Sequence, residues 1–165
     1  LMCVAEAEFA FRLARDLPAR AAPYAQDEVM AAVDALHPAI ELPDSRFADF
    51  VNAGAPQLLA DCACANYFVL GEAVAADWRT VDLSKHAVRA YVDAQLVQQG
   101  SGANVLGDPR IALTWIANEL AAGGRALRAG QIVTTGTSVV PVTIKVGSYV
   151  RADFGDFGVA EVTLS

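Results

Sequence analysis

The stretch EAEFAFRLARDLP, residues 6–18, decides the fold, because its apolar side chains recur at every second position. Followed back to residue 3, the alternation places one set on one face: Cys3, Ala5, Ala7, Phe9, Phe11 and Leu13. The other face carries Val4, Glu6, Glu8, Ala10 and Arg12. A period of two residues is typical of a strand with one face against a core. We therefore predict a strand over residues 3–13 that ends before Pro18.

The two acids on that strand favour a metal site. Glu6 and Glu8 project from the same face with their Cα atoms ~7 Å apart, so their like charges repel each other. A divalent cation removes the repulsion, and carboxylate oxygens suit Mg²⁺ or Mn²⁺. Glu41, in the short strand predicted over residues 39–42, is the candidate third ligand. The alternative stays open at this point: paired acids on an alternating strand more often face solvent.

Composition narrows the class of protein. The chain has 165 residues, of which 55% are hydrophobic, which predicts one domain over residues 1–165. A net charge of −7 without a basic cluster argues against nucleic acid, and no apolar run approaches the ~18 residues of a membrane helix. Three cysteines, an odd number, indicate reduced thiols and a cytoplasmic location. A mean hydropathy of +0.34 favours a homo-oligomer, which would cover exposed apolar surface.

The remaining pattern mixes helices with many strands. Residues 27–36 are expected to form a helix capped by Asp27, and residues 109–122 a second helix, with Asp108 as its cap and Gly123 after it. Residues 86–92 and 94–99 predict a hairpin. Further strands are expected at 67–70, 131–135, 141–146, 149–154 and 159–164. The fold class is therefore α+β, with a mostly antiparallel sheet and a few outer helices.

Five segments together resemble a known family. In order they are EAEFAFRLARDLP, AIELPDSRF, ADCACANYFVLG, GSGANVLGDPRIALTWIANELAAGGRALRAGQIVTTGT and VGSYVRADFGDFG. They are similar to the 2-keto-4-pentenoate hydratase and 4-oxalocrotonate decarboxylase branch of the fumarylacetoacetate hydrolase superfamily, over nearly the whole chain. The resemblance implies a rolled, mixed β-sheet of the C-terminal type. Members carry a further, mostly helical N-terminal region, and because Leu1 is not Met we expect sequence to precede it.

The resemblance also implies a chemistry. It assigns Glu6, Glu8 and Glu41 to the divalent ion, and it implies 2-oxo or 2-hydroxydienoic acids from aromatic catabolism as substrates, chelated through the carboxylate and the 2-oxygen. We expect a lyase that hydrates 2-hydroxypenta-2,4-dienoate, with decarboxylation of 2-oxo-3-hexenedioate as the alternative. A second alternative is a non-catalytic domain that binds a small acid or takes part in assembly. A complex with a paired decarboxylase, hydratase or aldolase is a further implied partner.

Other positions receive roles from the same resemblance. Asp44 and Asp61 are expected to be catalytic, and Arg46 to bind substrate or to pair with a neighbouring acid. The loop at the end of a predicted strand would hold the substrate carboxylate through Thr135, Gly136 and Thr137. A polar turn with a hydroxyl cap is the plain alternative for that loop. Cys62 departs from the Asn that usually follows this Asp, and a thiol is a poor hydrogen-bond donor.

Overall fold

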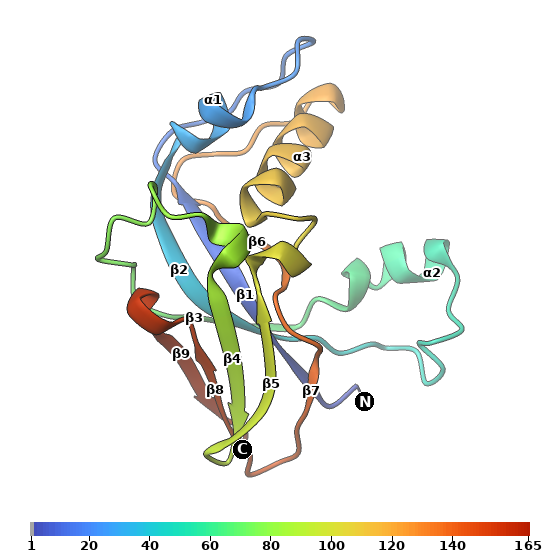
Figure 1. Ribbon diagram of the computed structural model, residues 1–165. Helices are drawn as coiled ribbons and strands as arrows, with labels where there is room; N and C mark the ends of the chain where they lie inside the picture. Colours follow the sequence, from blue (N-terminus) through green and yellow to red (C-terminus); the bar gives the residue numbers. More distant parts are fainter. Residues whose placement is uncertain (1) are drawn as a thin grey trace.

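The computed structural model describes residues 2–165 and arranges them as two antiparallel sheets with a few helices (Figure 1). The first sheet has the order β3-β2-β1-β6, with β7 paired to the start of β1, and the second has the order β5-β4-β8-β9. The strands are β1 Val4–Leu13, β2 Val33–Leu42, β3 Tyr67–Leu70, β4 Ala87–Val92, β5 Gln95–Ser101, β6 Ile132–Thr137, β7 Val142–Thr143, β8 Tyr149–Asp153 and β9 Val159–Thr163. The helices are α1 Gln26–Met30, α2 Ala55–Ala60 and α3 Pro109–Ala122. The predicted α+β class with a mostly antiparallel sheet is confirmed.

Strand β1 is the centre of the first sheet and lines the core. The predicted inward set from Ala5 to Leu13 is buried, and Phe11 is 0% exposed. The ring of Phe9 meets that of Phe154 edge-on at 4.9 Å between centroids, which joins the first sheet to the segment between β8 and β9. The opposite face of β1 is also covered over part of its length, since Glu8 is 1% exposed and Ala10 is 0% exposed. Because Glu8 is buried, it is not one of the solvent-facing acids that an alternating strand commonly carries.

The helix predicted over residues 27–36 is wrong in its second half. Helix α1 ends at Met30, and β2 runs from Val33 to Leu42, so the short strand predicted at 39–42 is the end of a ten-residue strand. The spacing of Met30, Val33 and Leu36 fits a helix, but β2 satisfies its backbone by pairing with β1 and with β3. His37 precedes Pro38, which disfavours the helical region for His37 and was the local sign of extended chain.

Helix α3 was predicted correctly because its signals are local. The Asp108 side chain accepts a hydrogen bond from the Arg110 backbone N–H at 2.8 Å, Pro109 takes the first position, and Gly123 follows the last turn. Its inner face is buried in the core through Leu113, Ala117 and Ala121. The helix therefore closes the core at one end of the sheets, beside α1 (Figure 1).

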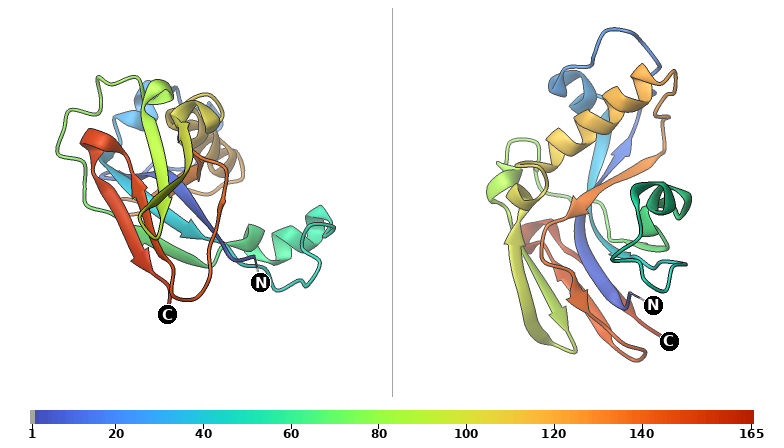
Figure 2. Two further views of the ribbon diagram at one scale, coloured as in Figure 1. Left: turned by 60° about the horizontal axis from the view of Figure 1, so that its bottom comes forward. Right: turned by 90° about the vertical axis from the view of Figure 1, so that its right-hand side faces the viewer.

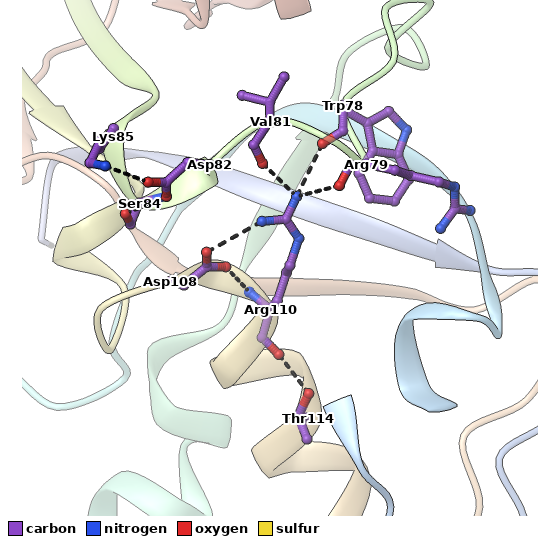
Figure 3. Close-up of polar contacts among 9 residues, drawn as sticks. All are labelled: Trp78, Arg79, Val81, Asp82, Ser84, Lys85, Asp108, Arg110 and Thr114. Atoms are coloured by element: carbon purple, nitrogen blue, oxygen red, sulfur yellow. Dashed lines mark hydrogen bonds and ion pairs between the residues drawn. The ribbon is translucent and has the colours of Figure 1, made fainter. Parts of the chain in front are cut away.

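Arg110 links the start of α3 to the segment before β4. Its guanidinium donates to the backbone carbonyls of Trp78 at 3.0 Å and Val81 at 2.8 Å, and it pairs with Asp108 (Figure 3). Only 12% of the Arg110 side chain is exposed, so these contacts are largely shielded from water. The nearby Lys85–Asp82 pair in the same view is much more open, with the lysine side chain 85% exposed.

The two faces of the first sheet are covered by different parts of the chain. The second sheet covers one face of β1 and β2. The segment that contains α2 lies on the opposite side of these two strands (Figure 2). The acids of β1 point away from the core face, and so toward the side on which α2 lies. Across residues 2–165, we find no helix that combines the length and the apolar character needed to cross a bilayer.

Candidate metal centre

Three glutamates from two neighbouring strands place their carboxylates together. Glu6 on β1 lies directly opposite Glu41 on β2, and Glu8 follows two residues along β1 on the same face. One carboxylate oxygen from each glutamate lies within 4.8 Å of those of the other two. The register of β1 against β2 thus brings together the three residues that the sequence had grouped as metal ligands.

Glu8 is the fixed member of this cluster. It is 1% exposed, and its carboxylate accepts hydrogen bonds from the Thr134 hydroxyl and from the Gly136 backbone N–H, the latter at 2.9 Å. The pairing of β1 with β6 shifts register between Glu8 and Ala10, which turns this N–H toward the carboxylate. Gly136 has a φ of 103°, a conformation that side-chain-bearing residues rarely adopt. Local backbone geometry therefore holds Glu8 in one orientation.

The electrostatics of the cluster are those of crowded like charges. Burial, together with the charge of Glu8, raises the pKa of Glu6. Burial and the charges of Glu8 and Glu6 raise the pKa of Glu41 to about 7. Among residues 2–165, no lysine or arginine forms an ion pair with any of the three. The cluster therefore lacks a positive partner from the described part of the chain.

A hard divalent cation fits this donor set. Carboxylate oxygens are the ligands that Mg²⁺ and Mn²⁺ prefer, and three monodentate carboxylates leave positions of an octahedron for water and substrate. A cation would also offset the burial and the repulsion that together raise the pKa values of Glu6 and Glu41. The hydrogen bonds on Glu8 hold its carboxylate ready for such an ion, so the residues present fit the group.

A cavity of about 230 Å³ adjoins the cluster on the same side of the sheet. Glu41 and Thr134 form its border with the acids. The rest of its lining comes from the start of β6 and from the segment leading into β3: Ile132, Ala65, Asn66, Tyr67 and Phe68. A ligand on the acid cluster would therefore extend into this hollow. A larger and mostly apolar cavity, about 480 Å³, lies beside it near the two ends of the described chain.

The loop predicted to hold a substrate carboxylate is engaged with the protein itself. The Thr135 hydroxyl donates to the Phe9 carbonyl at 2.9 Å, and the Thr137 hydroxyl donates to the Val139 carbonyl at 2.8 Å. Gly136 gives its N–H to Glu8. The three residues do lie at the cluster, because Thr137 pairs with Glu8 across the strands. Their contact with a substrate stays a prediction.

Asp61 and Arg46 form a separate contact in the loop after β2. The Asp61 carboxylate is 2% exposed and accepts from the Ser45 hydroxyl at 2.6 Å and from the Arg46 guanidinium at 2.6 Å. The Ser45 hydrogen bond, aided by Arg46 and opposed by burial, lowers the pKa of Asp61. The Arg46 side chain is 75% exposed. Neither Asp61 nor Arg46 belongs to the acid cluster, so their contact supplies no ligand for an ion bound there.

Asp44 lies at the same loop base. Its carboxylate accepts from the Met2 backbone N–H at 2.8 Å, and its own N–H donates to the Cys64 carbonyl at 2.9 Å. Cys62, the departure from the family pattern, is exposed, and Cys62, Ala63 and Cys64 all have positive φ. The predicted catalytic roles of Asp44 and Asp61 stay predictions.

Sequence reasoning missed several residues at the site. Thr134 was read only as part of a strand, although its hydroxyl lies on Glu8. Asn104 donates from its side-chain amide to the Ser138 carbonyl at 2.8 Å and so braces the loop that carries Gly136. Gly100 lies so close that an added Cβ would come within 2.0 Å of the same carbonyl. A signal for Asn104 existed in the segment GSGAN, where two glycines indicate close backbone approach.

The amino-acid sequence of this chain is similar to a known family and to several of its named members. The sequence pattern that defines the fumarylacetoacetate (FAA) hydrolase C-terminal family matches residues 2–165. A 4-oxalocrotonate decarboxylase from Pseudomonas sp. is 32% identical over 155 residues, which are 93% of this chain and 57% of that protein. A 2-keto-4-pentenoate hydratase from Paraburkholderia xenovorans strain LB400 is 33% identical over 153 residues, or 93% of this chain and 55% of that protein.

Solved structures give the same answer for the fold. The 4-oxalocrotonate decarboxylase from Pseudomonas putida G7, complexed with magnesium and adipate, superimposes with a TM-score of 0.87 at 27% identity. The match covers 98% of this chain and 60% of that one. The chain thus spans somewhat more than half the length of the relatives that it matches. The predicted resemblance is confirmed. The chain belongs to the fumarylacetoacetate hydrolase family, and it matches that family's C-terminal domain.

Proposed function

We propose that this chain is the metal-binding catalytic domain of a lyase that adds water to 2-hydroxypenta-2,4-dienoate to give 4-hydroxy-2-oxopentanoate. The observation that carries the proposal is the convergence of Glu6, buried Glu8 and Glu41 within 4.8 Å. Relatives named 2-keto-4-pentenoate hydratase, at about 33% identity, support the reaction class. The cofactor of this proposal is Mg²⁺ or Mn²⁺, and a structural relative carries magnesium.

The residues divide the work between holding and orienting. Glu6, Glu8 and Glu41 would hold the ion, and when bound it supplies the positive charge that polarises the carboxylate and 2-oxygen of the substrate. Thr134 and Gly136 keep the Glu8 carboxylate in position. In this proposal the loop Thr135, Gly136 and Thr137 also borders the bound carboxylate of the substrate. In this proposal the cavity beside Glu41 receives the unsaturated end of the substrate.

The test is a metal-dependent assay with a matched control. Consumption of 2-hydroxypenta-2,4-dienoate should require Mg²⁺ or Mn²⁺, stop with a chelator and return when the ion is restored. Glu8→Gln should abolish turnover and leave the melting temperature of the metal-free protein unchanged or raised, because one of three like charges is removed. Glu72→Gln, an exposed position after β3, is the control and should retain activity. Full activity in Glu8→Gln would contradict the proposal.

Decarboxylation of 2-oxo-3-hexenedioate is the second candidate. It is favoured by the 4-oxalocrotonate decarboxylase relatives, one 32% identical in sequence and one with a TM-score of 0.87. Both reactions need the same chelation of a 2-oxygen and a carboxylate, so the acid cluster supports either. Assaying the two acids side by side, with release of CO₂ as the readout for the second, separates them.

The proposed active form is an oligomer of this protein. Large apolar side chains are exposed, including Val146 at 79%, Leu59 at 77% and Tyr67 at 68%. Apolar surface of this kind is commonly buried against another copy or against a partner enzyme, such as a decarboxylase, hydratase or aldolase of the same pathway. Light scattering at working concentration tests self-association, and a monomer mass would count against it.

A further inference from the structure

Strand β2 carries a proline in the interior of the first sheet. Pro38 lies on a strand that pairs with β1 on one side and with β3 on the other. Proline has no backbone N–H, so in sheets it is usually confined to edge strands, strand starts and bulges. Pro38 occurs at none of these places, and the ladder beside it therefore lacks one donor.

The missing donor belongs opposite Gly71, the residue that follows β3. The register places Ala39 opposite Leu70, so one step further along places Pro38 opposite Gly71. The Gly71 N–H donates to the Pro38 carbonyl at 2.8 Å, as in the hydrogen-bonded pairs of an antiparallel ladder. In such a pair the second bond runs from the N–H of residue 38 to the Gly71 carbonyl, and proline cannot form it.

The side chain of His37 supplies a donor to the same carbonyl. Its Nδ1 lies 2.9 Å from the Gly71 carbonyl oxygen. Because a carbonyl oxygen only accepts, Nδ1 carries a proton, and in the neutral ring Nε2 then has the lone pair. A proton on Nε2 would be an unsatisfied buried donor, because Nε2 has no hydrogen-bond partner among residues 2–165. His37 is 4% exposed, so water hardly competes for the bond to Gly71.

The surroundings of Gly71 make this contact sensitive to displacement. A Cβ added to Gly71 would lie 2.6 Å from the carbonyl oxygen of Val159 on β9 and 3.0 Å from that of Pro38. The backbone at Gly71 is thus packed closely between β2 and β9, where no larger residue fits. Strand β3 has only 4 residues, so the hydrogen bond from His37 is a large part of what holds this end of β3 to β2.

The same pair of strands carries part of the candidate site. Glu41, the third acid of the cluster, lies on β2 directly opposite Phe68 on β3. Phe68 in turn lines the cavity beside the cluster. The pair formed by Pro38 and Gly71 is three residues from Glu41 along β2 and three from Phe68 along β3. Loosening it would shift Glu41 relative to the cavity wall.

We infer that His37 is a positioning residue of the candidate metal centre. Its Nδ1–H takes the place of the N–H that Pro38 lacks, and so holds β3 to β2 beside Glu41. His37 acts through the pairing of the strands and is neither a ligand nor a catalytic group. The hydrogen bond stands without the proposed function, whereas its effect on a bound substrate rests on that function.

A double-mutant cycle tests whether one donor replaces the other. His37→Leu should weaken Mg²⁺ binding about tenfold in calorimetry, the size expected for one buried hydrogen bond. Pro38→Ala restores a backbone N–H opposite Gly71, so adding His37→Leu to it should weaken Mg²⁺ binding by only about twofold. His37→Asn, whose side-chain amide N–H lies near the place of Nδ1, should keep an affinity close to that of the wild type. Equal losses from His37→Leu in the two backgrounds would overturn the inference.

A control variant separates positioning from a general loss of stability. The Asn118 side chain on α3 likewise donates to a backbone carbonyl, that of Tyr24, at 3.1 Å. Asn118→Leu should lower the melting temperature, as His37→Leu should, but leave Mg²⁺ affinity unchanged. Similar losses of Mg²⁺ affinity in the two variants would show that stability alone sets the affinity, and would remove the positioning role.

The tautomer of His37 gives a readout that depends on no folded variant. The chain has two histidines, and the other, His86, contacts the Phe154 carbonyl through Nε2 at 2.6 Å. In ¹⁵N NMR of the histidine-labelled wild-type chain, we therefore expect one ring with its proton on Nδ1 and one with its proton on Nε2. His37→Asn assigns the two sets of signals. A His37 ring with its proton on Nε2 alone would overturn the inference.

Failure of the proposed function would look different. If no 2-hydroxydienoic or 2-oxo acid is turned over while Mg²⁺ binding keeps the coupling between His37 and Pro38, the lyase falls and the positioning role stands. Mg²⁺-dependent turnover without that coupling would leave the lyase standing and remove the role of His37.

Discussion

The affinity of the acid cluster for Mg²⁺ should depend on pH, because a proton competes with the ion. Burial and the charges of Glu8 and Glu6 raise the pKa of Glu41 to about 7 in the metal-free protein. Below that pH, Glu41 carries a proton that must leave before its carboxylate can act as a ligand. The apparent affinity therefore rises with pH through about 7 and becomes constant above it.

The size of the effect follows from this single proton. With a pKa of about 7, the apparent binding constant is reduced roughly tenfold at one pH unit below the pKa and hardly at all one unit above it. We therefore expect about a tenfold gain in Mg²⁺ affinity between pH 6 and pH 8. Burial and the charge of Glu8 also raise the pKa of Glu6, so a second proton can only steepen the acid end of the curve.

Calorimetry in two buffers with different heats of ionisation measures both the affinity and the protons released. About one proton should be released per ion at pH 6 and almost none at pH 8. Glu41→Gln should bind Mg²⁺ more weakly and with a flatter pH dependence, whereas the exposed control Glu72→Gln should keep the wild-type slope. Equal wild-type affinity at pH 6 and pH 8, with no proton release, would refute the reasoning.

Three further outcomes are expected. Arg110→Met removes a 12% exposed guanidinium that donates to the Trp78, Arg79 and Val81 carbonyls and pairs with Asp108, so the free energy of unfolding should fall by about 3 kcal/mol in denaturant titrations. Lys85→Met, at a pair open to solvent, should leave it unchanged, and equal losses in the two variants would contradict the contrast. Asn104→Leu should weaken Mg²⁺ binding by calorimetry, because it releases the loop whose N–H holds Glu8; unaltered affinity in a folded variant would exclude that support. Thr137→Val should weaken Mg²⁺-dependent oxalate binding about tenfold while Mg²⁺ affinity holds, and unchanged oxalate affinity would remove Thr137 from the site.

Elements with local signals were predictable from sequence. Strand β1 alternates at every second residue, and α3 has its own cap, its first-position proline and its terminal glycine, so neither depends on distant chain. The second half of the helix predicted at 27–36 failed because its apolar spacing fits a helix, whereas β2 is buried on both faces and so lacks the alternation that indicates a strand. Pairing with β1 and β3, which lie elsewhere in the sequence, decided between them.

The candidate site also has one part that local sequence patterns predict and another part that they do not. The shared direction of Glu6 and Glu8 follows from the strand period, but the approach of Glu41 depends on the register of β1 against β2, which no local pattern gives. Its place in a short predicted strand made Glu41 a candidate third ligand, and the family resemblance assigned it that role. The hydroxyl of Thr134 reaches Glu8 through a register shift in a strand more than a hundred residues away, so it was beyond sequence reasoning.

The contacts of Asp61 suggest how the loop after β2 serves the site. The Asp61 carboxylate accepts hydrogen bonds from Ser45 and Arg46, and the Asp44 N–H donates to the Cys64 carbonyl. These contacts join the start of the loop, residues 44–46, to its end, residues 61–64. The chain continues directly from that junction into Ala65 and the residues that wall the cavity beside Glu41. Movement at the junction would therefore be transmitted to the wall within a few residues. A buried carboxylate whose oxygens accept these hydrogen bonds is better suited to fix that junction than to exchange protons with a substrate, since its pKa is lowered first by the Ser45 hydroxyl. For the proposed enzyme we therefore expect the acids of this loop to affect the substrate through the shape of the cavity, and the acids of β1 and β2 to affect it through charge.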